Sequence, residues 1–429
     1  MSTSRLRRLF AVLLALSLTA TARAQRPDTV SRTDSADPAA DGAWPSKFRI
    51  GFNEFNLGFT TFVLGAGFLI DYATHNQDSV GLDQIELHRM GKIRDSRFLL
   101  SGTLRTKRPI VWQSGLMYDW PTSKWLVRQT MLRVSLPEIL GTIDVGRMKE
   151  GLSQNRVMTG YDGWTTERFT FSDAAIPLLA DGIKWLGYAP SLNLVWNLGA
   201  FTDHWSEGQT FSYYEHQVVG RLAYVRMKSP TSGHLLHFGA GLHVGKPTHD
   251  TLQLKSKPEM FASPSFIDTG KFPARLGRIA GLESYYRNGP WLFGAEYYGE
   301  WVDSKQTGDP FFHGGDVVAT WIVTGETRPY TTTGGNFRAV KPARPVFRGG
   351  PGAWETVLRV SYSNLDAGTL TGGTFWRVTP MVNWHMTEQA RLAASYGFSV
   401  LDRFGKRGTA EFFQLRLQLQ LSRLGASSD

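Results

Sequence analysis

Apolar and polar residues alternate without a break along the last part of the chain. A repeat of two residues is that of an extended strand with one apolar face, because successive side chains of a β-strand point to opposite sides. Similar segments recur along the chain from residue 48 onward. In the clearest of them, one side would carry Phe413, Leu415, Leu417, Leu419 and Leu421, and the other side Gln414, Arg416, Gln418 and Gln420.

The alternation predicts seventeen extended segments, separated by breaks rich in Gly, Pro, Asn and Asp. We take the first two as one bent strand and therefore expect about sixteen strands. The segments are 48–57, 60–73, 95–105, 110–120, 124–136, 139–148, 181–189, 191–202, 213–227, 234–245, 276–287, 290–302, 312–323, 353–364, 374–385, 390–400 and 411–422.

Four connections between these segments are long: 74–93, 149–180, 246–275 and 324–351. Connections of this length are unusual in a compact soluble domain. They are typical of a transmembrane barrel, which has short turns at one end and long extracellular loops at the other. A soluble β-sandwich or propeller is the alternative, but we find no blade-length repeat, and tryptophans fall at segment ends. The sequence therefore predicts an all-β fold, a transmembrane antiparallel β-barrel.

The composition agrees with this fold. Aromatic residues reach 13% and include 14 Trp, whereas the mean hydropathy is only −0.23. Strands that alternate lipid-facing and lumen-facing residues give this combination. The chain has no cysteine, which excludes disulfides and thiolate metal sites. After the N-terminus no apolar run reaches about 18 residues, which excludes an ordinary transmembrane helix.

The N-terminal region has the features of an export signal. Residues 1–24 combine a start with three arginines, an apolar stretch from Leu9 to Leu18 and the cleavage pattern Ala22-Arg23-Ala24. A membrane anchor is the alternative, but the apolar stretch is too short to span a bilayer comfortably. Residues 25–46 are polar, and we expect them to be disordered. Removal of residues 1–24 leaves 43 basic and 37 acidic residues, a net charge of +6 that favours anionic partners.

Several motifs in the long loops and late strands resemble one family. The first block runs from Val145 to Leu152 as Val-Gly-Arg-Met-Lys-Glu-Gly-Leu, and Thr166-Glu167-Arg168-Phe169-Thr170 and Asp173 follow it. The second block comprises Trp321-Ile322-Val323-Thr324-Gly325-Glu326-Thr327-Arg328, Tyr330, Phe337, Pro342 and Gly352-Ala353-Trp354-Glu355, with Val382-Asn383-Trp384 later. These motifs resemble those of the phosphate-selective porin O and P family of bacterial outer-membrane channels.

The resemblance implies a sixteen-stranded trimeric pore in the outer membrane. One long loop would fold into the pore and narrow it, and Arg and Lys residues would guide anions through it. It places the barrel at residues 47–423 and leaves a short tail over 424–429. The chain differs from the family at its end, because it continues past Leu421 to an acidic terminus instead of ending on an aromatic residue.

Candidate residues for an anion pathway come from two arguments. The family match selects Arg147 and Arg168, and Lys149 and Arg156 lie beside them in the sequence. The strand phase selects Arg359, Arg377, Arg391 and Arg416, whose apolar neighbours must face lipid. An arginine fork can donate two parallel hydrogen bonds to an oxyanion. The alternative for each is a wall residue paired with an acid, and for Arg168 a loop clamp through Glu167. Glu326, Trp354 and Glu355 are expected to be structural.

Signals for an enzyme are weak. His237 and His243 share a strand face but would lie roughly 20 Å apart, too far to bind one metal ion. The chain has no HExxH, GxSxG or phosphate-loop motif. We therefore predict no enzyme but a passive porin that prefers anions and needs no cofactor or metal. Its expected partners are small anionic solutes, outer-membrane lipid and two further copies, with no nucleic acid. A loop-plugged barrel that serves binding or adhesion, and a barrel hydrolase, are the alternatives.

Overall fold

The computed structural model describes residues 48–120, 122–205, 213–227 and 233–421. The predicted signal peptide over 1–24, the predicted disordered segment over 25–46 and the predicted tail over 424–429 lie outside these residues.

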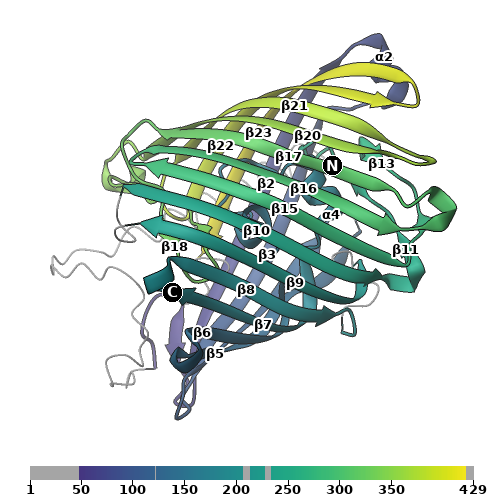
Figure 1. Ribbon diagram of the computed structural model, residues 1–429. Coiled ribbons are helices and arrows are strands. Elements are labelled where there is room, and N and C mark those ends of the chain that lie inside the picture. Colours follow the sequence, from purple (N-terminus) through teal and green to yellow (C-terminus); the bar gives the residue numbers. More distant parts are fainter. Residues whose placement is uncertain (1–47, 121, 206–212, 228–232, 422–429) are drawn as a thin grey trace.

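Sixteen antiparallel strands close into a barrel, as predicted (Figure 1). Each strand pairs with its neighbour in the chain, and β2 closes the sheet because it pairs with both β3 and β23. The barrel strands are β2 (Thr61–Gln77), β3 (Met90–Leu104), β4 (Ile110–Asp119), β5 (Lys124–Leu136), β6 (Gly141–Lys149), β7 (Leu179–Ala189), β8 (Leu194–Thr202), β9 (Tyr214–Met227), β10 (His234–Pro247), β15 (Leu276–Asn288), β16 (Trp291–Asp303), β17 (Phe311–Ile322), β20 (Ala353–Ala367), β21 (Leu370–His385), β22 (Ala390–Arg403) and β23 (Lys406–Leu421).

The first predicted segment is not a barrel strand. Within 48–57 the structure has only β1 (Glu54–Asn56), which folds back antiparallel on β2 with Phe55 opposite Phe62. The chain reverses near Gly58, whose φ of +84° lies in the left-handed region that glycine adopts without strain. The first two segments therefore form a hairpin rather than one bent strand, and the expected count of sixteen is confirmed.

The alternation of the strands separates an apolar outer face from a polar inner face. In β16, the predicted outward residues Phe293, Tyr297 and Trp301 are exposed, and the predicted inward Glu296 and Glu300 are buried. The same alternation holds in β10, β20, β22 and β23, except that Val400 of β22, which was expected to face outward, is buried. Tryptophans gather near strand ends on the outer face, where the Trp291 and Trp321 rings stack with centroids 5.0 Å apart. Such aromatic girdles mark the two interfaces of a membrane barrel.

Long loops enter the barrel from both ends. The first inward loop (residues 150–178) and the second inward loop (248–275) start at the end of the barrel that we call the loop end. The third inward loop (323–352) joins β17 to β20 at the opposite end, the turn end, where the barrel's first and last strands also begin and finish. β11 and β13 of the second loop and β18 of the third accordingly lie at opposite ends in Figure 1. The expectation of long loops at one end is therefore wrong for 324–351, because strand parity places it opposite.

The connections contain only short elements. None of the helices among the described residues is long and apolar enough to cross a membrane. The elements are α2 (Ser79–Gln84), α3 (Gln154–Val157), α4 (Thr170–Ala175), η1 (Pro137–Ile139), η2 (Pro190–Leu192), η3 (Thr248–Asp250), η4 (Lys305–Thr307), η5 (Val346–Arg348), and the pairs β11 (Thr251–Leu252) with β14 (Phe272–Pro273), β12 (Lys255–Ser256) with β13 (Ile267–Asp268), and β18 (Tyr330–Thr331) with β19 (Asn336–Phe337).

The three inward loops fill much of the barrel interior with packed side chains. Phe169 and Phe171 of the first loop are buried in one cluster with Phe266 of the second. Trp164 of the first loop packs on Phe337 of the third, with ring centroids 6.0 Å apart. The sequence predicted one loop in the pore, whereas all three meet inside it.

The lipid-facing assignment can be tested by placing a charge at mid-wall. Leu282 lies at the middle of β15 and is 68% exposed on the outer face. We expect Leu282→Arg to lower the free energy of unfolding in lipid vesicles by about 2–4 kcal/mol, because the charge would enter hydrocarbon. Leu82→Arg is the control, since Leu82 is also exposed but lies in α2 outside the wall. Equal losses in denaturant titrations of the two variants would contradict the assignment.

Candidate functional site

The first inward loop leaves β6 through a position that requires glycine. Gly151 has a φ of +86°, and a Cβ atom there would lie 1.6 Å from Asn197 Nδ2. Asn197 Nδ2 instead donates a hydrogen bond to the Gly151 carbonyl at 3.0 Å. The turn therefore directs the chain inward against β8.

Carboxylates on the inner wall hold the start of this loop. Ser153 caps α3. The N–H of Gln154 donates to Glu283 at 2.7 Å, and the N–H of Asn155 donates to Glu296 at 2.8 Å. The first N–H groups of a helix have no acceptor within it, so these side chains complete their hydrogen bonding. The loop is thereby fixed to β15 and β16.

Arginines on the opposite wall hold the loops by their backbone. The four arginines selected by strand phase point inward, as predicted, and are between 1% and 3% exposed. Each donates to a loop carbonyl: Arg391 to Gly163, Arg359 to Glu167, Arg416 to Thr166, and Arg377 to Pro258 of the second inward loop. These groups therefore anchor loops on β20 to β23, and their contacts are those of structural residues.

Between the first inward loop and the wall from β3 to β8 lie three adjoining cavities, all bordered by Thr159. Their volumes are about 40, 60 and 20 Å³, enough for single water molecules. Asp95, Asp144 and Glu167 are the acidic residues that line them. We call the basic residues around them the basic gallery: Arg94, Arg97, Arg128, Arg133, Lys149, Arg168, Lys184, Arg338 and Arg416. Nine basic against three acidic residues give the lining a formal charge of +6.

The acidic residues neutralise only part of the gallery. Glu167 accepts hydrogen bonds from Arg94 and Arg416, Asp95 from Arg97, and Asp144 from Arg133, with Lys184 3.8 Å away. Lys149 and Arg168 bond to carbonyl oxygens instead: Lys149 Nζ to Val157 and Met158 at 2.9 and 2.8 Å, and Arg168 Nε to Asn155 at 2.7 Å. These two cations therefore have no carboxylate in direct contact among the described residues.

Both members of the predicted Glu167–Arg168 pair are charged at neutral pH. Burial alone would raise the pKa of Glu167, but Arg94 and Arg416 outweigh it and hold the pKa well below its usual range. Burial, followed by repulsion from Arg156, lowers the pKa of Arg168 to about 10. The two side chains make separate contacts, Glu167 to wall arginines and Arg168 to its own loop.

Two of the predicted pathway residues lie away from the gallery. Arg147 is buried and pairs with Asp181 at 3.4 Å. Arg156 is buried within the first inward loop and pairs with Asp173 at 3.3 Å. Neither lines the three cavities. Of the eight predicted residues, the structure brings Lys149, Arg168 and Arg416 together at the gallery.

The residues predicted to be structural make structural contacts. Glu355 accepts hydrogen bonds from Arg328 at 2.7 and 2.8 Å, and from His385 and Asn383. Arg328 also donates to the Asp162 carbonyl at 2.9 Å and so ties the third inward loop to the first.

The other two residues of these motifs lie at the turn end. Glu326 accepts from the Ala343 N–H at 3.0 Å within the third inward loop. Trp354 is on the outer face, where its ring stacks on Trp384 with centroids 5.3 Å apart. The second signature block therefore stabilises the connection between β17 and β20.

The sequence analysis missed most of the gallery. β3 and β5 each contain an extra residue relative to the strand beside them. In β3 it lies opposite Leu69 and Ile70 of β2, and in β5 it lies opposite the segment from Ser114 to Leu116 of β4. These extra residues change the phase within the strand, so a simple alternation does not place every side chain. Where β5 is regular, the alternation could have identified an inward cation, because Arg133 stands between the apolar residues Leu132 and Val134. The missed residues are Arg94, Arg97, Arg128, Arg133, Lys184 and Arg338.

His237 and His243 contact different residues. His237 bonds to Tyr330 and Glu283, each at 2.8 Å, and His243 bonds to Gln217 at 2.6 Å. Among the residues that the structure describes, no group of three or more His, Asp or Glu side chains could hold a metal ion.

The role of Arg328 can be tested by removing its charge. We expect Arg328→Met to cost about 3–5 kcal/mol of stability, because Glu355 would keep its charge in a buried site without its main partner. Residues 323–352 should then exchange amide hydrogens faster and be cleaved sooner by protease. Arg344→Met, at an exposed position of the same loop, is the control and should change neither. Unchanged exchange in the Arg328 variant would contradict this anchoring role.

Stability should depend on pH through Glu150. Burial raises the pKa of Glu150 to about 8 from an ordinary 4.5, against the opposing effects of Arg156 and Gln217. Between these values the folded protein keeps a proton that the unfolded chain releases, so stability should fall as pH rises through this window. We expect Glu150→Gln to flatten the fall in unfolding midpoints measured from pH 5 to 8. The exposed Glu86→Gln should leave the slope as in the wild type, and the same slope in both variants would exclude Glu150 as its source.

Solved structures share this fold. The anion-selective porin of Comamonas acidovorans superposes with a TM-score of 0.54 at 13% identity, covering 84% of this chain and 100% of that chain. OmpT of Vibrio cholerae, described as a trimer form, gives 0.53 at 13% identity over 84% of this chain and 99% of its own. The channel DcaP of Acinetobacter baumannii gives 0.53 at 9% identity over 85% and 99%. At these identities the likeness concerns the fold alone.

Sequence comparisons identify the family. An uncharacterized protein of Caulobacter vibrioides is 29% identical over 182 residues, which are 42% of this chain and 36% of that protein. The family model for phosphate-selective porin O and P matches residues 184–421, more than half of the chain, and includes the second signature block but not the first. The chain therefore belongs to the phosphate-selective porin O and P family and is an outer-membrane β-barrel channel.

Proposed function

We propose that this porin conducts small anions, with a preference for oxyanions such as phosphate, through the basic gallery. The observation that carries the proposal is the excess of nine basic over three acidic residues around the cavities beside the first inward loop. Low-dielectric walls focus the field of such charges and raise the local concentration of anions.

Lys149 and Arg168 would interact most directly with a passing anion. Neither is held by a carboxylate, so both can exchange a carbonyl contact for an anion without leaving an acid unpaired. An arginine fork offers an oxyanion two parallel hydrogen bonds. The gallery cavities are only about 40, 60 and 20 Å³, so passage of an oxyanion requires movement of side chains or of the loop.

Export and assembly complete the proposal. Residues 1–24 would direct export and be removed, and the barrel would assemble as a homotrimer in the outer membrane. Support for the trimer comes from the family and from the trimer form described for OmpT of Vibrio cholerae. Diffusion through the gallery would be passive and would use no cofactor.

A second candidate function is favoured by the loops inside the lumen. Three loops from both ends pack together there, so the barrel could serve as a binding or adhesion platform with little conductance. Deletion of residues within 150–178 should then open a channel that the complete protein lacks. The same bilayer recording separates the two candidates, because a porin conducts without the deletion.

The proposal is tested by reversal potentials of the purified protein in a planar bilayer under gradients of chloride and of phosphate. We expect anion preference in the wild type, lowered about fivefold by Lys149→Gln or Arg168→Gln, because one charge near the ion is worth about 1 kcal/mol in watery surroundings.

Arg391→Gln is the matched control. Arg391 is buried, as Lys149 is, and also bonds to a carbonyl, but it does not line the gallery cavities. Its removal should leave the permeability ratio unchanged. Cation preference in the wild type, or equal shifts in all three variants, would refute the anion pathway, and absence of conductance would favour the plugged barrel.

A further inference from the structure

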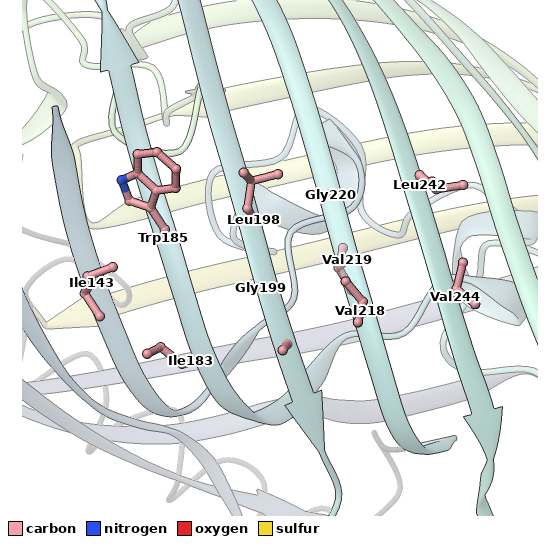
Figure 2. Close-up of a pocket in the computed structure, with 11 residues that line it drawn as sticks. Ile143, Ile183, Trp185, Leu198, Gly199, Val218, Val219, Gly220, Leu242 and Val244 are labelled. Atoms are coloured by element: carbon pink, nitrogen blue, oxygen red, sulfur yellow. The ribbon is translucent and has the colours of Figure 1, made fainter. Parts of the chain in front are cut away.

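An apolar groove lies on the outer wall over strands β6 to β10 (Figure 2). Its volume is about 570 Å³. Gly220 on β9 lies at its centre, between its register partners Leu198 on β8 and Leu242 on β10. A Cβ atom at Gly220 would meet only Leu198 within 4 Å, at 3.4 Å. The missing side chain therefore leaves open space between two apolar neighbours.

The groove reaches from Ile143, two residues after the start of β6, through Gly220 in the middle of β9 toward the loop end on β10. Val218 is four residues after the start of β9 at Tyr214, and Val244 is three residues before the end of β10 at Pro247. At about 3.3 Å per residue, its upper part is roughly 10–13 Å below the strand ends. The long loops of such barrels are extracellular, so this upper part faces the outer leaflet.

An outward-pointing arginine stands beside the groove. Arg278 on β15 is paired in register with Val244, which lines the groove, and with Trp301 of the outer aromatic residues. Its side chain is exposed, and no described residue forms a hydrogen bond or ion pair with it. An arginine on the lipid face costs roughly 2–4 kcal/mol at mid-plane but only about 0–1 near the interface. Arg278, two residues after the start of β15, is therefore level with lipid headgroups.

We propose that this groove binds a phosphorylated glycolipid of the outer leaflet, a lipid A, with an acyl chain over Gly220 and a phosphate on Arg278. The two parts match the two parts of the lipid. An acyl chain in the groove would be in contact with apolar side chains on several sides. The positive charge of Arg278 would bind the phosphate of the same lipid.

Charge complementarity favours this occupant over a second copy of the chain. The wall over β6 to β10 is apolar, so contact between the grooves of two copies would bury Arg278 without offering an acid. An unpaired buried charge is strongly unfavourable. A phosphate-bearing lipid satisfies the same arginine and fills the groove.

The proposal is tested by native mass spectrometry of the purified full barrel with added lipid A. We expect the wild type to retain lipid A, and to lose about tenfold in retention when the lipid is dephosphorylated. Arg278→Gln should show the same loss, as expected for one charge-assisted contact of about 1.4 kcal/mol. Gly220→Leu should also lose retention, because its side chain fills the groove.

Two matched controls separate this site from the rest of the wall. Arg226→Gln removes an outward arginine at the turn end of β9, and Ala240→Leu adds an outward side chain on β10 below the groove. Both should retain lipid A as the wild type does, with all variants folded by circular dichroism. The proposal would be overturned if the wild type retained phosphatidylglycerol as well as lipid A, or if the two controls lost lipid A as the test variants do. A lower oligomer mass of Gly220→Leu would also overturn it, because the groove would then be a contact with a second copy.

Discussion

Hydrocarbon offers no hydrogen-bond partner to the backbone, and the whole structure depends on this constraint. A strand that crosses the membrane must be paired on both sides, so the sheet has to close. Here closure runs through β2, in which Ala66 faces Phe98 of β3 on one side and Leu421 of β23 on the other. β23, the strand with the most regular alternation of apolar and polar residues, therefore completes the wall by pairing with β2.

Closure creates an interior that must accommodate the polar half of every strand. Buried arginines are costly unless they are fully hydrogen-bonded. The wall from β20 to β23 meets this cost with the carbonyl groups of inward loops, as Arg391 does with Gly163. Irregular loop backbone also needs partners inside the barrel. Wall arginines and loop carbonyls thus satisfy each other, which explains why three loops pack where one was expected.

The two sides of the first inward loop differ in consequence. On the side facing β20–β23, its carbonyl groups accept hydrogen bonds from the wall arginines. On the side facing β3–β7, the wall has more basic than acidic side chains around the cavities. The anion preference that we propose arises from this asymmetry rather than from the total charge. On the outer wall, the missing side chain at Gly220 leaves an apolar groove, and Arg278 stands beside it in register with Val244.

The sequence by itself determined the fold class, the number of barrel strands and, in the regularly alternating strands, which side chains point inward, because a period of two in polarity has one meaning for a wall between lipid and water. The motifs also indicated the family. Only the tertiary structure decided what the inward cations contact. Arg359 and Lys149 carry the same charge, yet one anchors a loop and the other borders a cavity. That difference depends on where distant loops cross the barrel and on bulges that shift the strand phase, and neither is a local property of the chain.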